Sequence, residues 1–225
     1  MTTGIRFGIF AAMFAASFGL HADERKKDST VAPDKVMERL REGNARFVAD
    51  KPTARDTYPN QRAKLAAKQQ PFAIVLTCAD SRVVPEFIFD QQLGALFVLR
   101  VAGNVADPVV LGSIEYAVEH LHPSVIVVLG HSNCGAVRAA VDGGKAEGNL
   151  GKLVELVHVG RDLPNDKQKA VDLGVAANVL HQVDALTKKS TVINDFVKSD
   201  RVRLVPGVYS MQTGAVEWLK RPGGP

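Results

Sequence analysis

The chain has 225 residues, with 28 basic and 24 acidic side chains that give a formal net charge of +4. Acidic residues are interspersed among the basic ones, so no basic stripe indicates a nucleic-acid surface, and a small-molecule partner is favoured. This length suits one globular domain with a sizeable core.

The N-terminus predicts a secretory signal peptide over residues 1–22. Arg6 supplies a positive charge, and the uncharged run from Phe7 to Leu20 is shorter than the ~20 residues that a membrane span needs. We therefore expect cleavage after Ala22, a single catalytic domain over 23–225 and a periplasmic or secreted protein with no stable membrane span. An uncleaved membrane anchor is the alternative.

The first half of the remaining chain alternates helical and strand-like segments. An amphipathic helix within 28–58, with Val36, Leu40 and Phe47 on one face, is expected outside the main sheet, and a second helix at 61–68. Apolar runs at 72–77 and 124–129 are continuous, as in strands buried on both faces, with a third strand at 96–100 and a helix at 108–121 between them. This alternation implies a parallel sheet with right-handed crossovers.

The second half is predicted to be helical and to end in a hairpin. Helices are expected at 136–140, 150–158, 165–188 and 192–198, and strands at 203–210 and 215–219. The predicted fold class is α/β: a mostly parallel central sheet with flanking helices, an N-terminal helical arm and a C-terminal edge hairpin.

Two short segments carry residues of the types that bind metals. Cys78 opens a Cys-Ala-Asp-Ser-Arg segment directly after one apolar run, and a His131-Ser-Asn-Cys134-Gly segment follows another. Ligands of open α/β sheets bind beyond the carboxyl ends of strands, so these side chains are expected to meet at one end of the sheet. Two thiolates and one imidazole suit one Zn²⁺ per chain and leave a fourth position for water, as in catalytic zinc sites.

A Cys78–Cys134 disulfide is the alternative, because an even cysteine count in an exported protein usually indicates a disulfide. A disulfide needs neither the nearby His131 nor the Asp-x-Arg pair after Cys78, so the context favours zinc. Asp80 can accept a hydrogen bond from an oxygen in the fourth position, while Arg82 pairs with Asp80 and keeps it off the metal. Without the cysteine, such a pair would be read as a surface ion pair.

The Cys-x-Asp-x-Arg and His-x-x-Cys-Gly segments together resemble a beta-class carbonic anhydrase of the plant-like branch, in an exported bacterial form. The likeness runs from Arg46-Phe47 to Tyr209. It implies reversible hydration of carbon dioxide to bicarbonate and a proton by zinc-bound hydroxide. It also implies a homodimer or a dimer of dimers. Whether Asp80 takes the fourth zinc position in an inactive state is left open by the sequence.

The resemblance also implies a substrate pocket. The residues that match it by position are Gln69 as an amide donor, Phe97 and Ala102 as apolar walls, Tyr116 and Gly135. Gln69, Phe97 and Tyr116 could otherwise be ordinary loop and core residues. The chain departs from its relatives at Val101, where asparagine is usual. Val75 stands where the other branch has the tryptophan of a regulatory bicarbonate site, so that site is expected to be absent.

Two other functions remain open from the sequence. The same fold and zinc hydroxide could hydrolyse carbonyl sulfide or carbon disulfide. Alternatively, the chain could be a non-catalytic α/β binding domain stabilised by a disulfide or by zinc.

Overall fold

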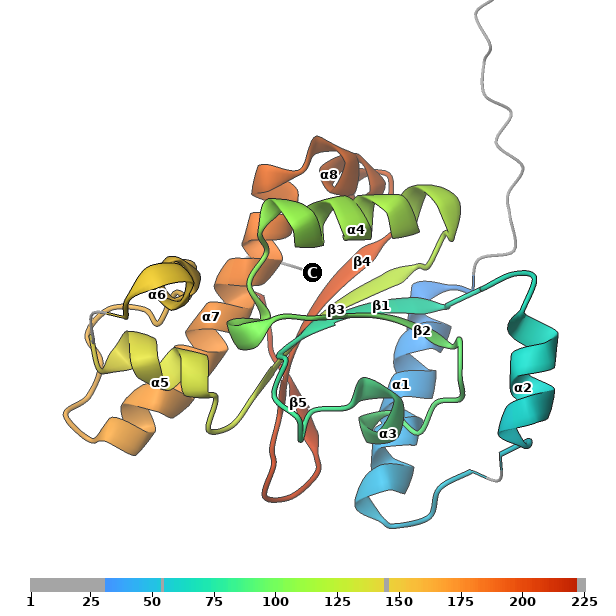
Figure 1. Cartoon of the computed structure of the whole chain (residues 1–225), viewed down its shortest axis with the longest axis horizontal. Coiled ribbons are helices and arrows are strands. Elements are labelled where there is room, and N and C mark those ends of the chain that lie inside the picture. Colours follow the sequence, from blue (N-terminus) through green and yellow to red (C-terminus); the bar gives the residue numbers. More distant parts are fainter. Residues whose placement is uncertain (1–30, 54, 144–145, 222–225) are drawn as a thin grey trace, which may run out of the picture.

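The computed structural model describes residues 31–53, 55–143 and 146–221, so the predicted signal peptide lies outside the described residues. Its five strands form one sheet in the order β2-β1-β3-β4-β5, in which β5 alone is antiparallel to its neighbour (Figure 1). This confirms the predicted mostly parallel sheet with a C-terminal edge hairpin. The strands are β1 (Ala73–Thr77), β2 (Leu96–Arg100), β3 (Val125–His131), β4 (Arg203–Tyr209) and β5 (Val216–Trp218).

Most of the helices lie where the sequence predicts them, with ends that differ by a few residues. Helix α3 and the turn η1 are not predicted from the sequence, because segments of four and three residues are too short to show a helical period. The helices are α1 (Pro33–Val48), α2 (Tyr58–Leu65), α3 (Pro85–Ile88), η1 (Ala102–Asn104), α4 (Pro108–His120), α5 (Gly135–Val141), α6 (Gly148–Val154), α7 (Lys167–Lys189) and α8 (Thr191–Lys198).

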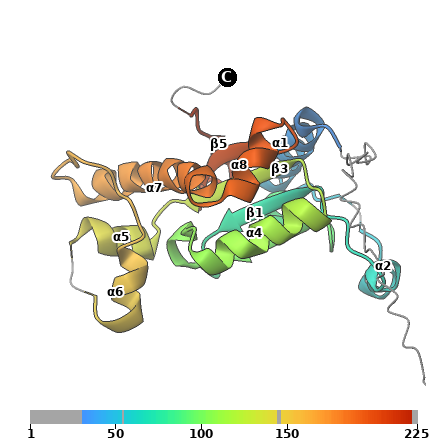
Figure 2. The ribbon, with the colours of Figure 1, turned by 90° about the horizontal axis from the view of Figure 1, so that it is seen from above.

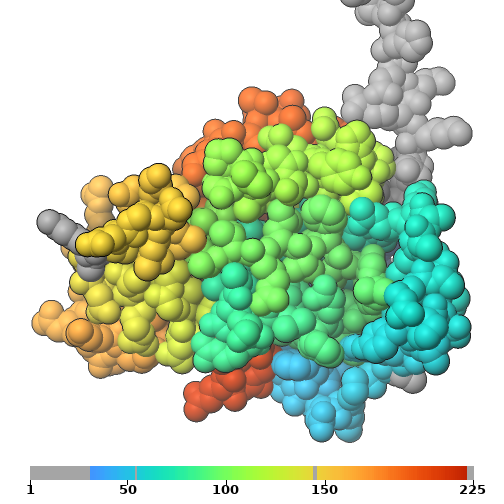
Figure 3. All heavy atoms as spheres, in the orientation of Figure 1, coloured from blue at the N-terminus to red at the C-terminus, as the bar shows by residue number. Residues whose placement is uncertain are grey.

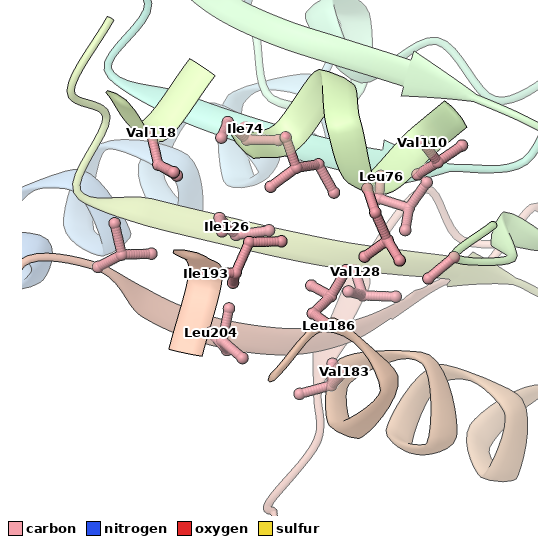
Figure 4. Packing of buried hydrophobic residues seen from close by; sticks show 14 of the residues in the cluster. Ile74, Leu76, Val110, Val118, Ile126, Val128, Val183, Leu186, Ile193 and Leu204 are labelled. Carbon is pink, nitrogen blue, oxygen red and sulfur yellow. The ribbon is translucent and has the colours of Figure 1, made fainter. Parts of the chain in front are cut away.

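Helices cover both faces of the sheet, which makes three layers (Figure 2). On one face α4, α7 and α8 pack against alternate strand residues such as Ile74, Ile126 and Leu204 (Figure 4). On the other face α1 and α3 pack against Val75 and Val127. Burial on both faces explains why the β1 and β3 sequences are continuously apolar.

Helix α1 packs against one face of its own sheet, so the predicted apolar face with Val36 and Leu40 is part of the core. Val36 and Leu40 are fully buried in the same apolar cluster as Val127 of β3. Asn44, also buried, donates to the Gly214 carbonyl (2.8 Å) and accepts from the Val216 amide (2.9 Å). The apolar face of α1 is therefore covered by residues of its own chain.

The register of β1 and β3 brings their carboxyl ends together. Thr77, the last residue of β1, pairs with Leu129, and its hydroxyl donates to the Leu129 carbonyl over 2.8 Å. Strand β3 continues beyond the predicted end at Leu129 to His131, which pairs with Tyr209 of β4. Cys78, the residue after β1, and His131, the last residue of β3, therefore lie at the same end of two adjacent strands.

Helices α5 and α6 lie at one end of the molecule and α2 at the other (Figures 1 and 3). Strand β3 leads directly toward α5, so the carboxyl end of the sheet faces that end of the molecule. Within the described ranges, no helix is both long and apolar enough to cross a membrane.

A buried carboxylate ties the segment after α1 to the end of α3. Asp90, whose side chain is 2% exposed, accepts hydrogen bonds from Arg46 (2.7 Å), Thr53 (2.6 Å) and Arg55 (3.1 Å). Burial alone would raise the pKa of Asp90, but these donors outweigh burial and hold it well below its usual range. The carboxylate is therefore charged and stabilising at neutral pH.

Replacing Asp90 with asparagine is expected to lower the free energy of unfolding by about 2 kcal/mol at pH 7, because two guanidinium groups lose their charged partner. Since the folded pKa lies below the unfolded value of about 3.9, the advantage of the wild type should shrink as the pH falls below about 4. Urea unfolding at pH 7 and pH 3.5 measures both effects. Asp142→Asn, at an exposed site, is the matched control. Equal free energies of unfolding for the wild type and Asp90→Asn at pH 7 would contradict this account. So would a difference between them that is as large at pH 3.5 as at pH 7.

Candidate metal centre

The carboxyl ends of β1 and β3 bring three potential metal ligands together, as predicted. Cys78 follows β1, His131 ends β3 and Cys134 directly precedes α5. One ligand atom from each residue lies within 4.8 Å of the other two, and all three side chains are buried. The two cysteines are free thiols, so the structure does not contain the alternative disulfide.

The orientation of His131 leaves one ring nitrogen available to a metal. Its Nδ1 lies 2.9 Å from the Ser132 carbonyl oxygen, which can only accept, so Nδ1 carries the proton and Nε2 has the lone pair. Nε2 is buried and has no hydrogen-bond partner. Ser132 is itself held by its amide, which donates to the Tyr209 carbonyl, and by its hydroxyl, which accepts from the Met211 amide. An orphaned nitrogen beside two thiols fits a zinc ion, which the donor set also favours.

The turn between His131 and Cys134 depends on Asn133. This residue has φ of 56°, a left-handed conformation that asparagine tolerates better than most residues. Its side-chain oxygen accepts a hydrogen bond from Gln168 of α7 over 3.0 Å. After Cys134, a Cβ at Gly135 would meet no atom within 4 Å, so the chain leaves open space at this predicted pocket residue.

The two neighbouring thiols shift each other's pKa values in opposite directions. The Cys134 thiol, followed by the backbone amides of Asp80 and Gly103, lowers the pKa of Cys78, although burial opposes this. The neighbouring Cys78 sulfur and burial raise the pKa of Cys134. One thiolate is therefore formed easily, and a cation would be needed to stabilise the second.

Asp80 and Arg82 form the predicted ion pair. Arg82 donates from Nε to Oδ1 (2.9 Å), from Nη2 to Oδ2 (2.8 Å) and from its backbone amide to Oδ1 (3.0 Å). The hydrogen bonds from the Arg82 side chain have the largest effect, and the one from its backbone amide adds to it. Together they hold the pKa of Asp80 well below its usual range. Asp80 is thus a fixed carboxylate two residues from Cys78 that can only accept hydrogen bonds.

Arg100, at the end of β2, holds the loop that carries Cys78 and Asp80. Its guanidinium donates to the carbonyls of Cys78 (3.3 Å), Ala79 (3.4 Å) and Asp80 (2.6 Å). The sequence predicts a strand that ends at Arg100 but indicates no role for its side chain in the site. The available signal was a single charge at the end of the apolar run 96–99.

The remaining predicted pocket residues are spread over the chain. Ala102 lies near Cys78, because the preceding amide of Val101 donates to the Thr77 carbonyl over 3.0 Å. Gln69 is exposed and precedes β1, so the five residues of that strand, about 16 Å, separate it from Cys78.

Phe97 and Tyr116 are also distant from the carboxyl end of the sheet. Phe97 pairs with Ile74 near the amino end of β1. Tyr116 lies on α4, is 48% exposed and contacts the His120 ring, with ring centroids 5.0 Å apart. A single chain therefore does not assemble these two residues or Gln69 around the cysteines, and their role stays a prediction.

Comparison with known proteins agrees with this geometry. A family model described as carbonic anhydrase matches residues 73–216. The solved beta-carbonic anhydrase of Coccomyxa has a TM-score of 0.66 and 27% identity, covering 82% of this chain and 85% of that one. The chain belongs to the beta-carbonic anhydrase family. The predicted family, enzyme class and fold are thereby confirmed.

Two curated relatives are similar over most of their length. Carbonic anhydrase 2 of Mycobacterium tuberculosis is 42% identical over 190 residues, which cover 81% of this chain and 90% of the relative. The carbonic anhydrase of Mycolicibacterium smegmatis is 41% identical over 193 residues, which cover 82% of this chain and 92% of the relative. Carbon dioxide hydration is the activity that this membership of the beta-carbonic anhydrase family implies.

Gly130 allows α7 to pack directly beside His131. A Cβ at Gly130 would lie 2.5 Å from Val179 and 3.2 Å from Val175, both on α7. Gly130→Ala is therefore expected to displace α7 from β3, to destabilise the fold by about 1–3 kcal/mol and to lower the zinc content per chain. Thermal unfolding and metal analysis measure these effects. Gly112→Ala on α4, where a Cβ meets nothing within 4 Å, should lower neither the stability nor the zinc content, and alanine's higher helix propensity should if anything raise the melting temperature. Unaltered melting and full zinc in Gly130→Ala would contradict the packing argument.

Proposed function

We propose that this beta-carbonic anhydrase hydrates carbon dioxide to bicarbonate and a proton with one Zn²⁺ held by Cys78, His131 and Cys134. The observation that carries the proposal is the convergence of these three ligand atoms within 4.8 Å, one of them an unpartnered buried nitrogen. When bound, zinc would lower the pKa of a water molecule and so supply the nucleophile near neutral pH. The protein supplies the rest of the chemistry.

Asp80 orients the attacking solvent in this proposal. Its carboxylate accepts a hydrogen bond from the solvent O–H, which leaves a lone pair directed at the carbon of the substrate. Arg82 engages both carboxylate oxygens and so opposes their binding to the metal. An inactive state with Asp80 as the fourth ligand would require Arg82 to release it.

The uncharged substrate needs apolar walls, and Ala102 and the open space at Gly135 supply part of them. We propose that Gln69, Phe97 and Tyr116 reach an active site only across an interface, in a homodimer or a dimer of dimers. Two features support an interface on this side of the molecule. Strand β2 is an edge of the sheet, and Tyr116 on the adjacent α4 is exposed.

Export to the periplasm or the exterior is part of the same proposal and rests on the sequence of residues 1–22. Mature protein recovered from the medium or the periplasm with residue 23 at its N-terminus would support it. Protein retained in the cytoplasm with residues 1–22 intact would contradict it.

A stopped-flow pH-indicator assay tests the activity. The zinc-loaded wild type should hydrate carbon dioxide well above the uncatalysed rate, and Asp80→Ala should retain zinc and fold but lose about 100-fold or more in kcat. Asp195→Ala, at an exposed position on α8, is the control and should be unaffected. No hydration by the zinc-loaded wild type from neutral pH to about 9 would reject the proposal. Faster turnover on carbonyl sulfide or carbon disulfide would mean that one of these, and not carbon dioxide, is the substrate. Full activity in Asp80→Ala would show that Asp80 does not orient the attacking solvent.

A further inference from the structure

We propose that His158 and His181 form a pH-sensitive switch, which holds residues 156–158 on α7 at neutral pH and releases them when both rings are protonated. His158 follows α6, and His181 lies on α7. Their imidazole rings are stacked, with centroids 4.5 Å apart and planes inclined by 18°. Neither residue is a proposed zinc ligand. The regulatory meaning of the switch rests on the proposed function, because hydration of carbon dioxide releases a proton.

The histidine pair lies in a surface pocket of about 300 Å³. Ala177, Leu180 and Asp184 of α7 and Arg221 line the rest of this pocket. A pocket that is open to the surface admits water, so both rings can exchange protons with the solvent.

The stack tolerates one proton but not two. A neutral imidazole pair can remain stacked, and so can an imidazolium over a neutral ring, because the face of an aromatic ring attracts a cation. Two imidazolium rings at this distance repel each other. The pair therefore takes up its protons in two separate steps, and the second step works against the stack.

The charges around the histidine pair also oppose the second proton. Lys188 and Lys189 of α7 and the guanidinium of Arg221 are positive. Within the described part of the chain, the carboxylate that faces the pair is Asp184, which already pairs with Arg221 (3.2 Å) and with Lys188 (3.6 Å). This carboxylate is therefore shared among several cations and compensates only part of the added charge.

The pKa of His181 gives the direction of the pH dependence. Burial and, after it, the charge of His158 lower this pKa. Because the folded pKa lies below the unfolded value of about 6.5, the contribution to stability is complete above about pH 6.5 and is lost as the pH falls through the lowered pKa. The switch is therefore closed at neutral pH and opens in acid.

The segment that the histidine pair holds is connected to the turn at 102–104. The Asn178 side chain accepts from the His158 amide (3.0 Å) and donates to the Gly103 carbonyl (2.8 Å). Gln182, one helical turn later, donates to the Leu156 carbonyl over 2.8 Å. Residues 156–158 are thus held on α7 by two buried amides as well as by the ring stack.

The same segment packs behind the metal centre. Val157 is buried in one apolar cluster with Cys78 and Cys134. A Cβ at Gly103 would approach the Val157 side chain to 2.9 Å, so this packing is close. Release of residues 156–158 would therefore loosen the apolar surroundings of both cysteines.

Histidine NMR and amide hydrogen exchange of the zinc-loaded protein test the switch. The two rings should titrate in linked steps, with His181 below the ordinary histidine pKa of about 6.5. Between about pH 7.5 and about pH 5.5, where histidine changes its charge, the His158 amide should lose about two- to fivefold in protection, after correction for the intrinsic exchange rate. His158→Gln and His181→Gln keep this amide but remove one ring, so neither should show the loss.

The matched control is His120→Gln on α4. The His120 ring contacts the ring of Tyr116, with centroids 5.0 Å apart, rather than a second histidine. This variant should show the wild-type loss of protection at the His158 amide.

A loss of protection in acid that occurs in the wild type and in His120→Gln, but in neither variant of the histidine pair, supports the proposal. Rings that titrate independently of each other overturn it. The same loss of protection in His158→Gln or His181→Gln also overturns it.

The rate of zinc release to a chromophoric chelator tests the connection to the metal centre. Every form should release zinc faster in acid, because the cysteine ligands become protonated. The wild type should show a further increase of about two- to fivefold over His158→Gln at about pH 5.5, and none at about pH 7.5. Equal release rates at both pH values would overturn this connection. A wild type that binds no zinc would overturn the proposed function, whereas the NMR titration would still decide whether the switch exists.

Discussion

The parallel pairing of β1 with β3 determines where the three candidate metal ligands lie. Thr77 pairs with Leu129, so the backbone places Cys78 and His131 on adjacent strands at one end of the sheet. A shift of one residue would exchange the two faces of β1 and disrupt the close packing of both apolar clusters, so the fit of its side chains favours this register. The Thr77 hydroxyl, bonded to the Leu129 carbonyl, holds it where the site begins.

A zinc ion with two thiolates and an imidazole has no net charge, which makes it a weak electrophile toward water. Backbone amides beside the two cysteines favour their thiolate forms: those of Asp80 and Gly103 lower the pKa of Cys78, and those of Ala136 and Val137, at the start of α5, oppose the larger effects that raise the pKa of Cys134. In the proposed zinc site, such amides would reduce the charge that the sulfurs donate to the metal. The loop and turn around the cysteines are therefore part of the chemistry.

Much of the fold and the ligand set could be predicted from the sequence because the signals are local. The apolar runs of β1 and β3 indicate buried strands, and Cys78 and His131 are adjacent in sequence to the ends of those strands. The Asp80–Arg82 pair was predictable because the two residues are two positions apart. Helix α3 and the turn η1 could not be predicted, since four and three residues show no helical period.

The supporting contacts could not be predicted because they join residues distant in sequence. Arg100 holds the Cys78 loop from another strand, and Asn178 reaches Gly103 across 75 positions. An amide at position 178 within an apolar helix face indicates a buried hydrogen bond but not its partner. The pocket positions Gln69 and Tyr116 pose a different problem, since no single chain brings them to the cysteines.

X-ray absorption at the zinc edge of the purified mature protein tests the central claim most directly. The account predicts two sulfur ligands at about 2.3 Å, one imidazole nitrogen at about 2.0–2.1 Å and one further light atom. A coordination shell without sulfur, or a metal-free active protein whose two cysteines are joined in a disulfide, would contradict it.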